Sequence, residues 1–484
     1  MAEKFYITTT LPYVNAPPHI GFALEIIQAD VVARWQASLG KEIFFNTGTD
    51  EHGLKVFQKA RELGQTPQEY CDSAAKKFID LKGKLGLLED INFIRTTDPH
   101  HISAAQAFWQ RCEKSGDIYK KNYKAKYCVG CELEKTDSEL VGGCCPLHPG
   151  QKIEIIDEEN YFFRFSKYEK PLLEFYAANP DFVVPAGRFN EIKSFVKGGL
   201  KDFSVSRVKE KMPWGIPVPG DENQVMYVWF DALVNYISCL DWPNDKKKFD
   251  GFWGTKDAPN AIQVAGKDNL RQQTAMWQAM LMSAGLPNSK QVFIHGFVTS
   301  GGQKMSKSLG NVIDPISLVE KYGTDPVRYF LLREIPADED GDFTYEKFEE
   351  RYNADLAKGL GNLASRVVTV AKKTGIANQT SCTDSEMEHA IEEAKNTSGR
   401  MVNEYKFNEA LASIWKLVNF CDRYIEKTQP WKTGDKTSMA SLMFALRAIA
   451  GMVEPFIPES AAKIAAMIKT GETTPLFPRL EKHQ

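Results

Sequence analysis

The hydrophobic residues near the start of the chain follow two different periods. Positions 5–11 are β-branched and aromatic, which is typical of a buried strand. Three prolines at positions 12–18 then exclude regular hydrogen bonding. Across positions 20–39 apolar residues return at helical spacing, and a glycine follows where a helix C-terminus is expected. The pattern predicts a strand, a loop and a helix, with His19 and Gly21 at the helix N-terminus.

Further strands and helices alternate along the first two thirds of the chain. Buried strands are predicted over positions 42–46, 91–96, 225–230, 261–265 and 291–297, and amphipathic helices over 68–85 and 99–114. Beyond about Glu334 helical patterns dominate, which favours an antiparallel α-helical bundle. We therefore expect an α/β protein, with a Rossmann-type doubly wound parallel sheet followed by an α-helical domain.

Composition limits the function and the location. A chain of 484 residues exceeds one core, so two or three domains are expected. The net charge of −3 excludes a generic polyanion binder, because such binding depends on many lysines and arginines, and any RNA contact must be local. No apolar run is long enough to cross a bilayer, and the first strand leaves no room for a signal segment, so we expect a cytoplasmic protein without membrane contact.

Cysteines concentrate in a polar segment that begins near position 118. Cys128 and Cys131 form one close pair, and Cys145 and His148 form another. Two such pairs can meet at a tetrahedral zinc ion, and four protein ligands leave no open position, so the metal is structural. Cys144 is an alternative to Cys145, and reduced thiols without metal are the alternative to the zinc site. Four lysines at positions 120–126 either contact a nucleic acid or form a solvated hairpin face, and the second is the more frequent explanation.

Three segments carry candidate substrate chemistry. The N–H groups of the helix that starts near His19 and Gly21 favour a phosphate, although a capping histidine beside a packing glycine is an alternative. Asp50 follows a strand and can hold an ammonium group, or it can be a helix N-cap. Lys304 and Lys307 lie on a loop that begins with two glycines and can close over a triphosphate.

These segments occur in the order of a known family. The pair Pro18-His19-Ile20-Gly21 and KMSKS resembles the two signatures of class I aminoacyl-tRNA synthetases. The chain is similar over nearly its whole length to the methionyl-tRNA synthetases with a single zinc knuckle, through LPYVNAPPHIG, TGTDEHG, the cysteine knuckle, KDFSVSR, YVWFDA, AGKD, KMSKSLGN, GNLASR and QPW. The resemblance implies a methionine–tRNA ligase that uses L-methionine, ATP with Mg²⁺, and tRNA(Met), and that carries one zinc ion.

The resemblance also implies roles for individual residues. The catalytic and ATP-binding residues would be His19, Gly21, Gly266, Asp268, Lys304 and Lys307. The methionine pocket would consist of Leu11, Tyr13, Asp50, Trp229, Ala232, Tyr236 and Gln273. Asn362, Arg366 and Trp431 would read the anticodon.

The implied domains are a first catalytic half (1–117), a zinc-binding connective-peptide insertion (118–215), a second catalytic half with the KMSKS loop (216–333) and an α-helical anticodon-binding domain (334–484). No dimerising domain follows, which favours a monomer. Phe22, Asn269 and Gln273 depart from the family pattern, since histidine, an aliphatic residue and histidine are usual there. Asn269 and Gln273 keep another class I synthetase open as an alternative, and Phe22 keeps open a catalytically dead, synthetase-derived RNA-binding zinc protein.

Overall fold

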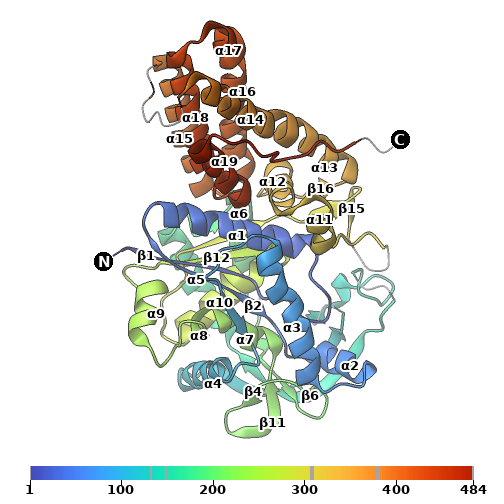
Figure 1. Cartoon of the computed structure of the whole chain (residues 1–484). Coiled ribbons are helices and arrows are strands. Elements are labelled where there is room, and N and C mark those ends of the chain that lie inside the picture. The colour runs from blue at the N-terminus through green and yellow to red at the C-terminus, as the bar shows by residue number, and fades with distance from the viewer. Residues whose placement is uncertain are drawn as a thin grey trace.

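A six-stranded parallel sheet forms the centre of the computed structural model, which describes residues 2–130, 133–147, 150–305, 310–376, 382 and 384–481 (Figure 1). The strand order is β3-β2-β1-β12-β13-β7. Their bounds are β1 (Lys4–Thr9), β2 (Glu42–Thr49), β3 (Asn92–Arg95), β7 (Val183–Val184), β12 (Ala261–Gly266) and β13 (Gln291–His295). The order reverses between β1 and β12, and a doubly wound sheet binds its ligand at the carboxyl ends of the strands at such a point.

Helices cover both faces of this sheet because alternate residues of each strand point in opposite directions. Phe5 and Ile7 of β1 belong to a core shared with α1 (Ile20–Ser38) and the helical domain. Tyr6, between them, belongs to a second core with α4 (Pro99–Lys114). The other helices of the catalytic part are α2 (Leu54–Glu62), α3 (Pro67–Lys84), α5 (Glu169–Ala178), α6 (Ala186–Lys197), α7 (Val228–Leu233), α8 (Asn235–Ser238), α9 (Lys246–Phe252), a π-helix (Gln272–Met276) and α10 (Trp277–Ser283).

The predicted strand over positions 225–230 is wrong in its second half. The strand β11 (Asp221–Met226) ends earlier, and α7 begins at Val228. Moreover, β11 pairs antiparallel with β9 (Ser206–Val208) and β10 (Pro217–Val218) in a small separate sheet. The remaining predicted strands and helices of the catalytic part are confirmed, with ends shifted by three residues or fewer.

The cysteine-bearing segment forms an antiparallel sheet of its own. Its strand order is β5-β4-β6-β8, with β4 (Ile118–Cys128), β5 (Leu133–Lys135), β6 (Glu154–Phe163) and β8 (Phe203–Ser204). A third small sheet consists of β14 (Val298–Ser300), β15 (Gln303–Lys304) and β16 (Gly341–Phe343). The hairpin between β14 and β15 is the predicted glycine turn, and Gly301 and Gly302 have φ values of +60° and +74°.

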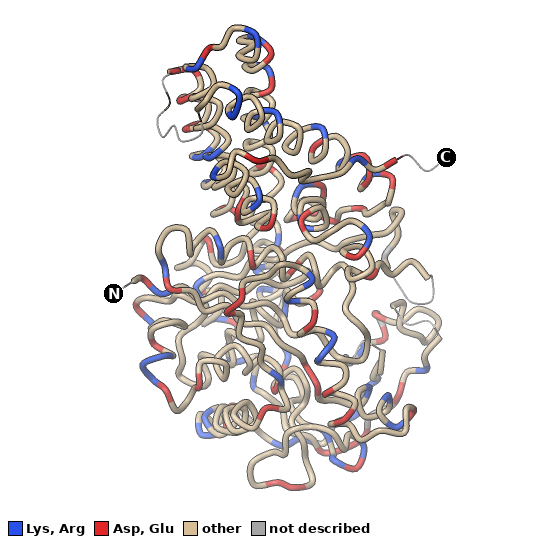
Figure 2. Tube along the Cα trace, in the orientation of Figure 1, with Lys and Arg blue, Asp and Glu red and all other residues tan. Residues whose placement is uncertain are grey.

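The C-terminal part is helical, as predicted. It contains α11 (Pro315–Tyr322), α12 (Thr324–Glu334), α13 (Tyr345–Arg351), a π-helix (Tyr352–Gly361), α14 (Asn362–Thr374), α15 (Ser385–Asn403), α16 (Phe407–Thr428), α17 (Pro430–Thr433), α18 (Lys436–Val453) and α19 (Pro458–Thr470). Within the described ranges, no helix has the length and apolar character that a membrane crossing requires. In the view of Figure 2, acidic and basic positions are interspersed over both parts, in keeping with the small net charge.

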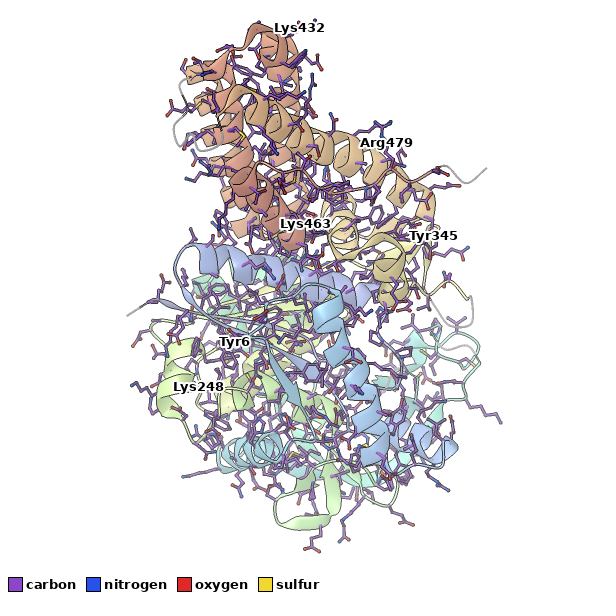
Figure 3. The ribbon with its side chains drawn as sticks, viewed as in Figure 1. Tyr6, Lys248, Tyr345, Lys432, Lys463 and Arg479 are labelled. Atoms are coloured by element: carbon purple, nitrogen blue, oxygen red, sulfur yellow. The ribbon has the colours of Figure 1, made fainter. Side chains whose placement is uncertain are left out.

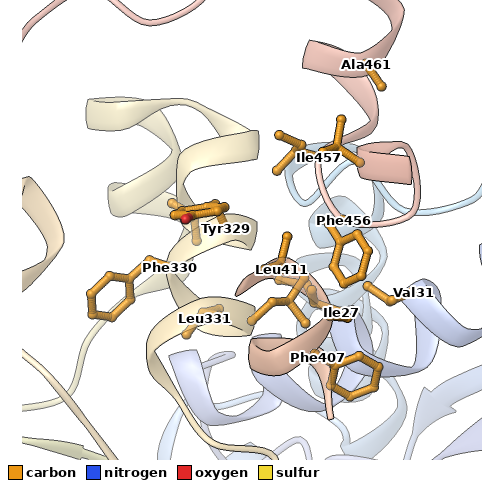
Figure 4. Packing of buried hydrophobic residues seen from close by; sticks show 14 of the residues in the cluster. Ile27, Val31, Tyr329, Phe330, Leu331, Phe407, Leu411, Phe456, Ile457 and Ala461 are labelled. Carbon is orange, nitrogen blue, oxygen red and sulfur yellow. The ribbon is translucent and has the colours of Figure 1, made fainter. Parts of the chain in front are cut away.

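A buried joint fixes the helical part to the catalytic part. Ile27 and Val31 of α1 lie beside Leu411 and Phe456 of the helical part (Figure 4). Next to them, the fully buried Arg328 binds the Asp30 carboxylate at 2.7 Å. The same guanidinium donates to the main-chain oxygens of Leu85, Pro455 and Phe456. Breaking such a satisfied buried pair is strongly destabilising, so the two parts form one continuous core at this joint.

Candidate active site

A cavity of about 470 Å³ opens at the carboxyl ends of the central strands, where the strand order reverses. It brings together all the predicted methionine and ATP residues of the catalytic part except two lysines: Leu11, Tyr13, His19, Gly21, Asp50, Trp229, Ala232, Tyr236, Gly266, Asp268 and Gln273. Lys304 lies in β15, and Met305 beside it lines the cavity. Lys307 lies outside the described residues.

His19 is the N-cap residue of α1 and also lines the cavity. Its Nδ1 accepts a hydrogen bond from the Gly21 N–H at 3.1 Å. Partial desolvation lowers the pKa of His19, and the carboxylates of Asp268 and Glu25 oppose this shift. Because Nδ1 is the acceptor in a neutral ring, the proton belongs on Nε2, which remains a donor. The capping and the phosphate-binding interpretations therefore describe one arrangement and do not exclude each other.

Gly21 has a steric reason to be glycine. A Cβ atom there would lie 3.0 Å from Cε1 of His19 and 3.1 Å from its Nδ1. Contacts this short would displace the His19 ring from the helix N-terminus. The glycine thus keeps both the backbone N–H and the imidazole at the same edge of the cavity.

Two strand ends hold Asp50 in the cavity wall. The Asp50 N–H donates to Pro12 O at 3.0 Å, and its main-chain oxygen accepts from Val14 N–H at 3.1 Å. The alternative of a helix N-cap is wrong, because α2 begins only at Leu54 and its N-cap position is Gly53. Asp50 instead lines the same cavity as Tyr13, Trp229 and Tyr236, where a cationic ligand group can reach its carboxylate.

Gln273 is held from both ends of its amide. Its Nε2 donates to the Tyr236 hydroxyl at 2.7 Å, and its Oε1 accepts from Gln263 Nε2 at 3.0 Å. Gln263 in turn accepts from Ser289 Oγ at 2.5 Å. Since all four side chains are buried or nearly so, this chain of bonds fixes the Tyr236 ring in the cavity wall.

Asp231 and two histidines form a buried group that the sequence analysis missed. The fully buried Asp231 carboxylate lies 2.7 Å from His52 Nδ1 and 3.0 Å from His101 Nε2. Burial acts to raise the pKa of Asp231, but the two histidines outweigh it and hold the pKa below its usual value. The group joins α7, which carries Trp229, to the segment that carries Asp50. Asp231 and His52 both belong to motifs that the sequence analysis identified, YVWFDA and TGTDEHG, but the sequence did not show that the two side chains touch.

A second group that the sequence analysis missed consists of Glu25 and His295, which also line the cavity. The Glu25 carboxylate accepts from Thr10 N–H at 2.7 Å, from Thr10 Oγ1 at 2.6 Å and from His295 Nε2 at 2.9 Å. The His295 Nδ1 lies 2.7 Å from Gly296 O. Burial opposes protonation of His295, but the Glu25 carboxylate prevails and raises its pKa. A glutamate on the buried face of an apolar helix was the available sequence signal.

Phe22, one of the departures from the family pattern, is part of the core. It is 8% exposed, and its ring lies 5.5 Å from that of Phe78 in an edge-to-face arrangement. It also borders the cavity. Its ring packs into the core, which gives the phenylalanine a structural role at this position.

The predicted zinc site lies partly outside the described residues. Cys131 and His148 are not among them, while Cys128 and Cys145 are each 1% exposed. Cys144 is less buried and forms an isolated bridge with Val141. Within the described part of the chain, no three acidic, cysteine or histidine side chains form a group suited to a metal. Cys145 is thus the more buried of the two neighbours, and its choice as the ligand stays a prediction.

The predicted anticodon residues lie together in the helical part. The Arg366 guanidinium is 4.7 Å from the ring centre of Trp431, which is 39% exposed. Asn362 is exposed one helical turn before Arg366 on α14. Trp431 belongs to α17, at the end of the helical part farthest from the sheet (Figure 1). Figure 3 labels its neighbour Lys432 there and Tyr6 in the central sheet, and so shows how far apart the two sites are.

Comparisons with known proteins cover the whole molecule. Residues 5–153 and 148–368 match the family described as tRNA synthetases class I (M), and residues 384–482 match the anticodon-binding domain of tRNA ligase. A methionine–tRNA ligase of Brucella suis is 43% identical over 477 residues, which are 96% of this chain and 91% of that protein. One from Thermotoga maritima is 41% identical over 95% of this chain and 74% of its own length.

A solved structure is similar over its full length. Mycobacterium tuberculosis methionyl-tRNA synthetase in complex with methionyl-adenylate superimposes with a TM-score of 0.91 at 34% identity. The match covers 99% of this chain and 100% of that protein.

Proposed function

The chain belongs to the class I tRNA synthetases, and we propose that it is a methionine–tRNA ligase that forms methionyl-adenylate from methionine and ATP and then charges tRNA(Met). The observation that carries the proposal is the single cavity at the sheet's reversal point. A carboxylate, aromatic rings and a helix N-terminus with its capping histidine all line this cavity. Such a cavity can hold an amino acid and a nucleotide in contact.

The first reaction needs position and charge rather than a protein nucleophile. A methionine carboxylate oxygen attacks the α-phosphorus of ATP, the bond to the β-phosphate oxygen breaks, and pyrophosphate leaves. A hydroxyl of the terminal tRNA ribose then attacks the activated carbonyl carbon, and AMP leaves. Holding the two reactants in line supplies much of the rate enhancement.

On the ATP side, His19 and the α1 N-terminus would donate to the phosphates, and Asp268 would accept from the ribose hydroxyls. The His19 capping bond supports this role because it leaves Nε2–H as the donor. Lys304 and Lys307 would close over the triphosphate and stabilise the developing charge. Mg²⁺ would accompany ATP and neutralise part of the phosphate charge.

On the methionine side, Asp50 would hold the ammonium group, and the apolar wall would hold the side chain. Trp229 and Tyr236 offer ring surfaces that suit a thioether, since sulfur–aromatic contacts are favourable. Leu11, Tyr13 and Ala232 would complete the wall, and Gln273 would fix the Tyr236 ring.

We further propose one structural zinc ion held by Cys128, Cys131, Cys145 and His148. The near-complete burial of Cys128 and Cys145 supports two of the three thiolate positions. When bound, the ion would cross-link a polar segment that has little core of its own. The division into 1–117, 118–215, 216–333 and 334–484, and a monomeric state, remain part of this proposal.

At the far end of the helical part, Asn362, Arg366 and Trp431 would read the anticodon. A partly buried arginine beside an exposed asparagine and an exposed tryptophan suits unstacked RNA bases, because these side chains offer hydrogen bonds and a stacking surface. The acceptor end of the same tRNA would have to reach the cavity, so one tRNA would contact both parts.

A panel of amino acids in ATP–pyrophosphate exchange tests the proposed function. We expect exchange with methionine to exceed exchange with leucine, isoleucine, valine and cysteine by orders of magnitude. Another class I specificity, which Gln273 and Asn269 leave as the second candidate, would give its maximum with a different amino acid. No exchange with any amino acid would indicate the catalytically dead RNA-binding protein.

A further inference from the structure

We propose that a basic cavity in the helical part binds a backbone phosphate of the tRNA, as an RNA contact separate from the anticodon cluster; the identity of the RNA rests on the proposed function. The cavity has a volume of about 290 Å³. It lies between α12, the π-helix Tyr352–Gly361 and α16, and Arg333, Lys416 and Arg423 line it.

The basic side chains outnumber the acidic ones in this cavity. Arg333 Nε is buried and has no hydrogen-bond partner among the described residues. Arg423 is exposed, and in the part of the chain that the structure describes no carboxylate is paired with it. The Lys416 ammonium lies 2.7 Å from Glu393, so its charge is partly balanced. Two guanidinium groups therefore remain for an anionic ligand.

The acidic residue that lines the cavity has other partners. The Asp355 Oδ2 accepts from the Tyr329 hydroxyl at 2.8 Å and lies 3.3 Å from NH1 of Arg351. Trp415 Nε1 donates to Asp355 O at 3.1 Å, and its ring lies 4.6 Å from the ring of Tyr329. The wall is thus rigid, and the negative charge of Asp355 is balanced from outside the cavity. A fixed site with unbalanced guanidinium groups favours phosphate, which arginine binds with two parallel hydrogen bonds.

The cavity lies on the same helix face as the anticodon cluster. Trp415, Asn419, Arg423 and Glu426 follow one another at intervals of three or four residues along α16. Glu426 binds Arg366 at 2.6 Å. Glu426 lies eleven positions after Trp415, a distance of about 16 Å along the helix. An RNA stem whose loop reaches Trp431 can therefore place a backbone phosphate at the cavity.

Binding of a short RNA hairpin with a CAU loop, measured against salt concentration in the full chain, tests the site. We expect Arg423→Gln and Arg333→Gln each to weaken binding roughly tenfold at low salt. Each should also reduce the slope of log K against log salt by about one, as for the loss of one phosphate contact. Arg423→Lys should keep the slope. The matched control is Arg400→Gln, which removes an exposed arginine on α15 and should bind like wild type.

A phosphate contact carries no base information, so hairpins with CAU and CAC loops should lose affinity equally. Wild-type slopes in both glutamine variants, or no hairpin binding by the wild type, would overturn the site. Loss of affinity for the CAU hairpin alone would also overturn it. The assay needs no methionine activation. Failure of the exchange assay would therefore overturn the proposed function and leave the result on this cavity intact.

Discussion

The guanidinium of Arg366 lies 4.7 Å from the ring centre of Trp431 and is held there by Glu426 at 2.6 Å. A tryptophan that is 39% exposed is thus paired with a cation whose position is fixed by a second side chain. The ring remains accessible to a base, and the cation beside it can meet a base edge or a phosphate. This pairing lies in α17 and α14, far from the cavity at the sheet.

Because of that separation, Trp431→Ala should divide the two half-reactions. Loss of one stacking surface amounts to about 1–3 kcal/mol per base, so tRNA charging should fall roughly tenfold or more. Pyrophosphate exchange should remain near wild type, since the proposed site for methionine and ATP lies in the other part. The measurement compares charging and exchange with the same enzyme preparation.

The anticodon reading itself is checked with CAU and CAC transcripts at identical salt. If the variant discriminates between the two as sharply as wild type does, Trp431 is not an anticodon reader. A parallel loss in both half-reactions with a lower melting temperature would point to a structural role instead.

Asp422, next to this cluster, gives a pH dependence. Its pKa is raised to about 6, mainly by burial. The Arg366 cation opposes this shift, and the Glu426 carboxylate adds to it. A carboxyl whose pKa is raised in the folded state binds its proton more tightly there than in the unfolded chain. Its ionisation therefore lowers the free energy of unfolding, and this loss develops as pH rises from about 4 to 6. Asp422→Asn should therefore stabilise the protein by about 1 kcal/mol at pH 7.5, less than the full shift implies because the group is partly solvated. The gain should vanish near pH 4. A gain that is the same at both pH values would contradict the assignment.

Local sequence signals predicted the strand and the helix on either side of His19 well. The strand–proline–helix pattern placed His19 at the N-terminus of α1 and a glycine just after its end, because capping and φ requirements depend on adjacent residues. The prediction of a strand over positions 225–230 was wrong in its second half, because β-branched and aromatic residues suit either a strand or a short buried helix. Packing against the second core decides in favour of α7.

Long-range pairs could not be predicted in the same way. His295 and Glu25 are 270 positions apart, and they meet because β13 lies two strands from β1 in the sheet. Likewise, β14 pairs with β16, which lies beyond Glu334 in a region where the sequence showed helical patterns and no strand. Strand order is a property of the whole chain, so motifs could indicate which residues matter without showing which of them touch.

The proposed zinc site predicts unequal effects of two neighbouring cysteines. Cys145→Ser should reduce bound zinc and lower the melting temperature, because a thiolate ligand is lost. Cys144→Ser should keep the zinc, since that side chain is the less buried of the two. Metal content by mass spectrometry or atomic absorption, with both variants purified alike, checks this. Exchanged outcomes would transfer the ligand role to Cys144.

Lys307 tests the charge stabilisation in the first reaction. Lys307→Ala should lower the rate of methionine activation on the order of a hundredfold or more, the scale of losing one transition-state donor. Lys246→Ala is the control, because that lysine is exposed on α9. Near-normal exchange by Lys307→Ala would remove the residue from the mechanism.

Asp231 connects α7 to the segment of Asp50, which are two walls of the proposed methionine pocket, so its loss should change methionine binding in particular. The carboxylate lies one residue before Ala232 and two after Trp229, and it binds His52, which is two residues after Asp50. Asp231→Asn keeps the shape of the side chain but removes the charge that both histidines contact, so the protein should lose up to about 3–5 kcal/mol of stability.

If the Asp231–His52 pair also positions the walls of the proposed pocket, the KM for methionine should rise severalfold. The KM for ATP should stay constant, because the proposed nucleotide contacts lie on α1 and β12. Ser238→Ala is the matched control, since it removes only the hydroxyl that binds the other ring nitrogen of His101 at 2.9 Å. If Asp231→Asn melts earlier but shows unchanged KM values for both substrates, the buried group serves the fold alone.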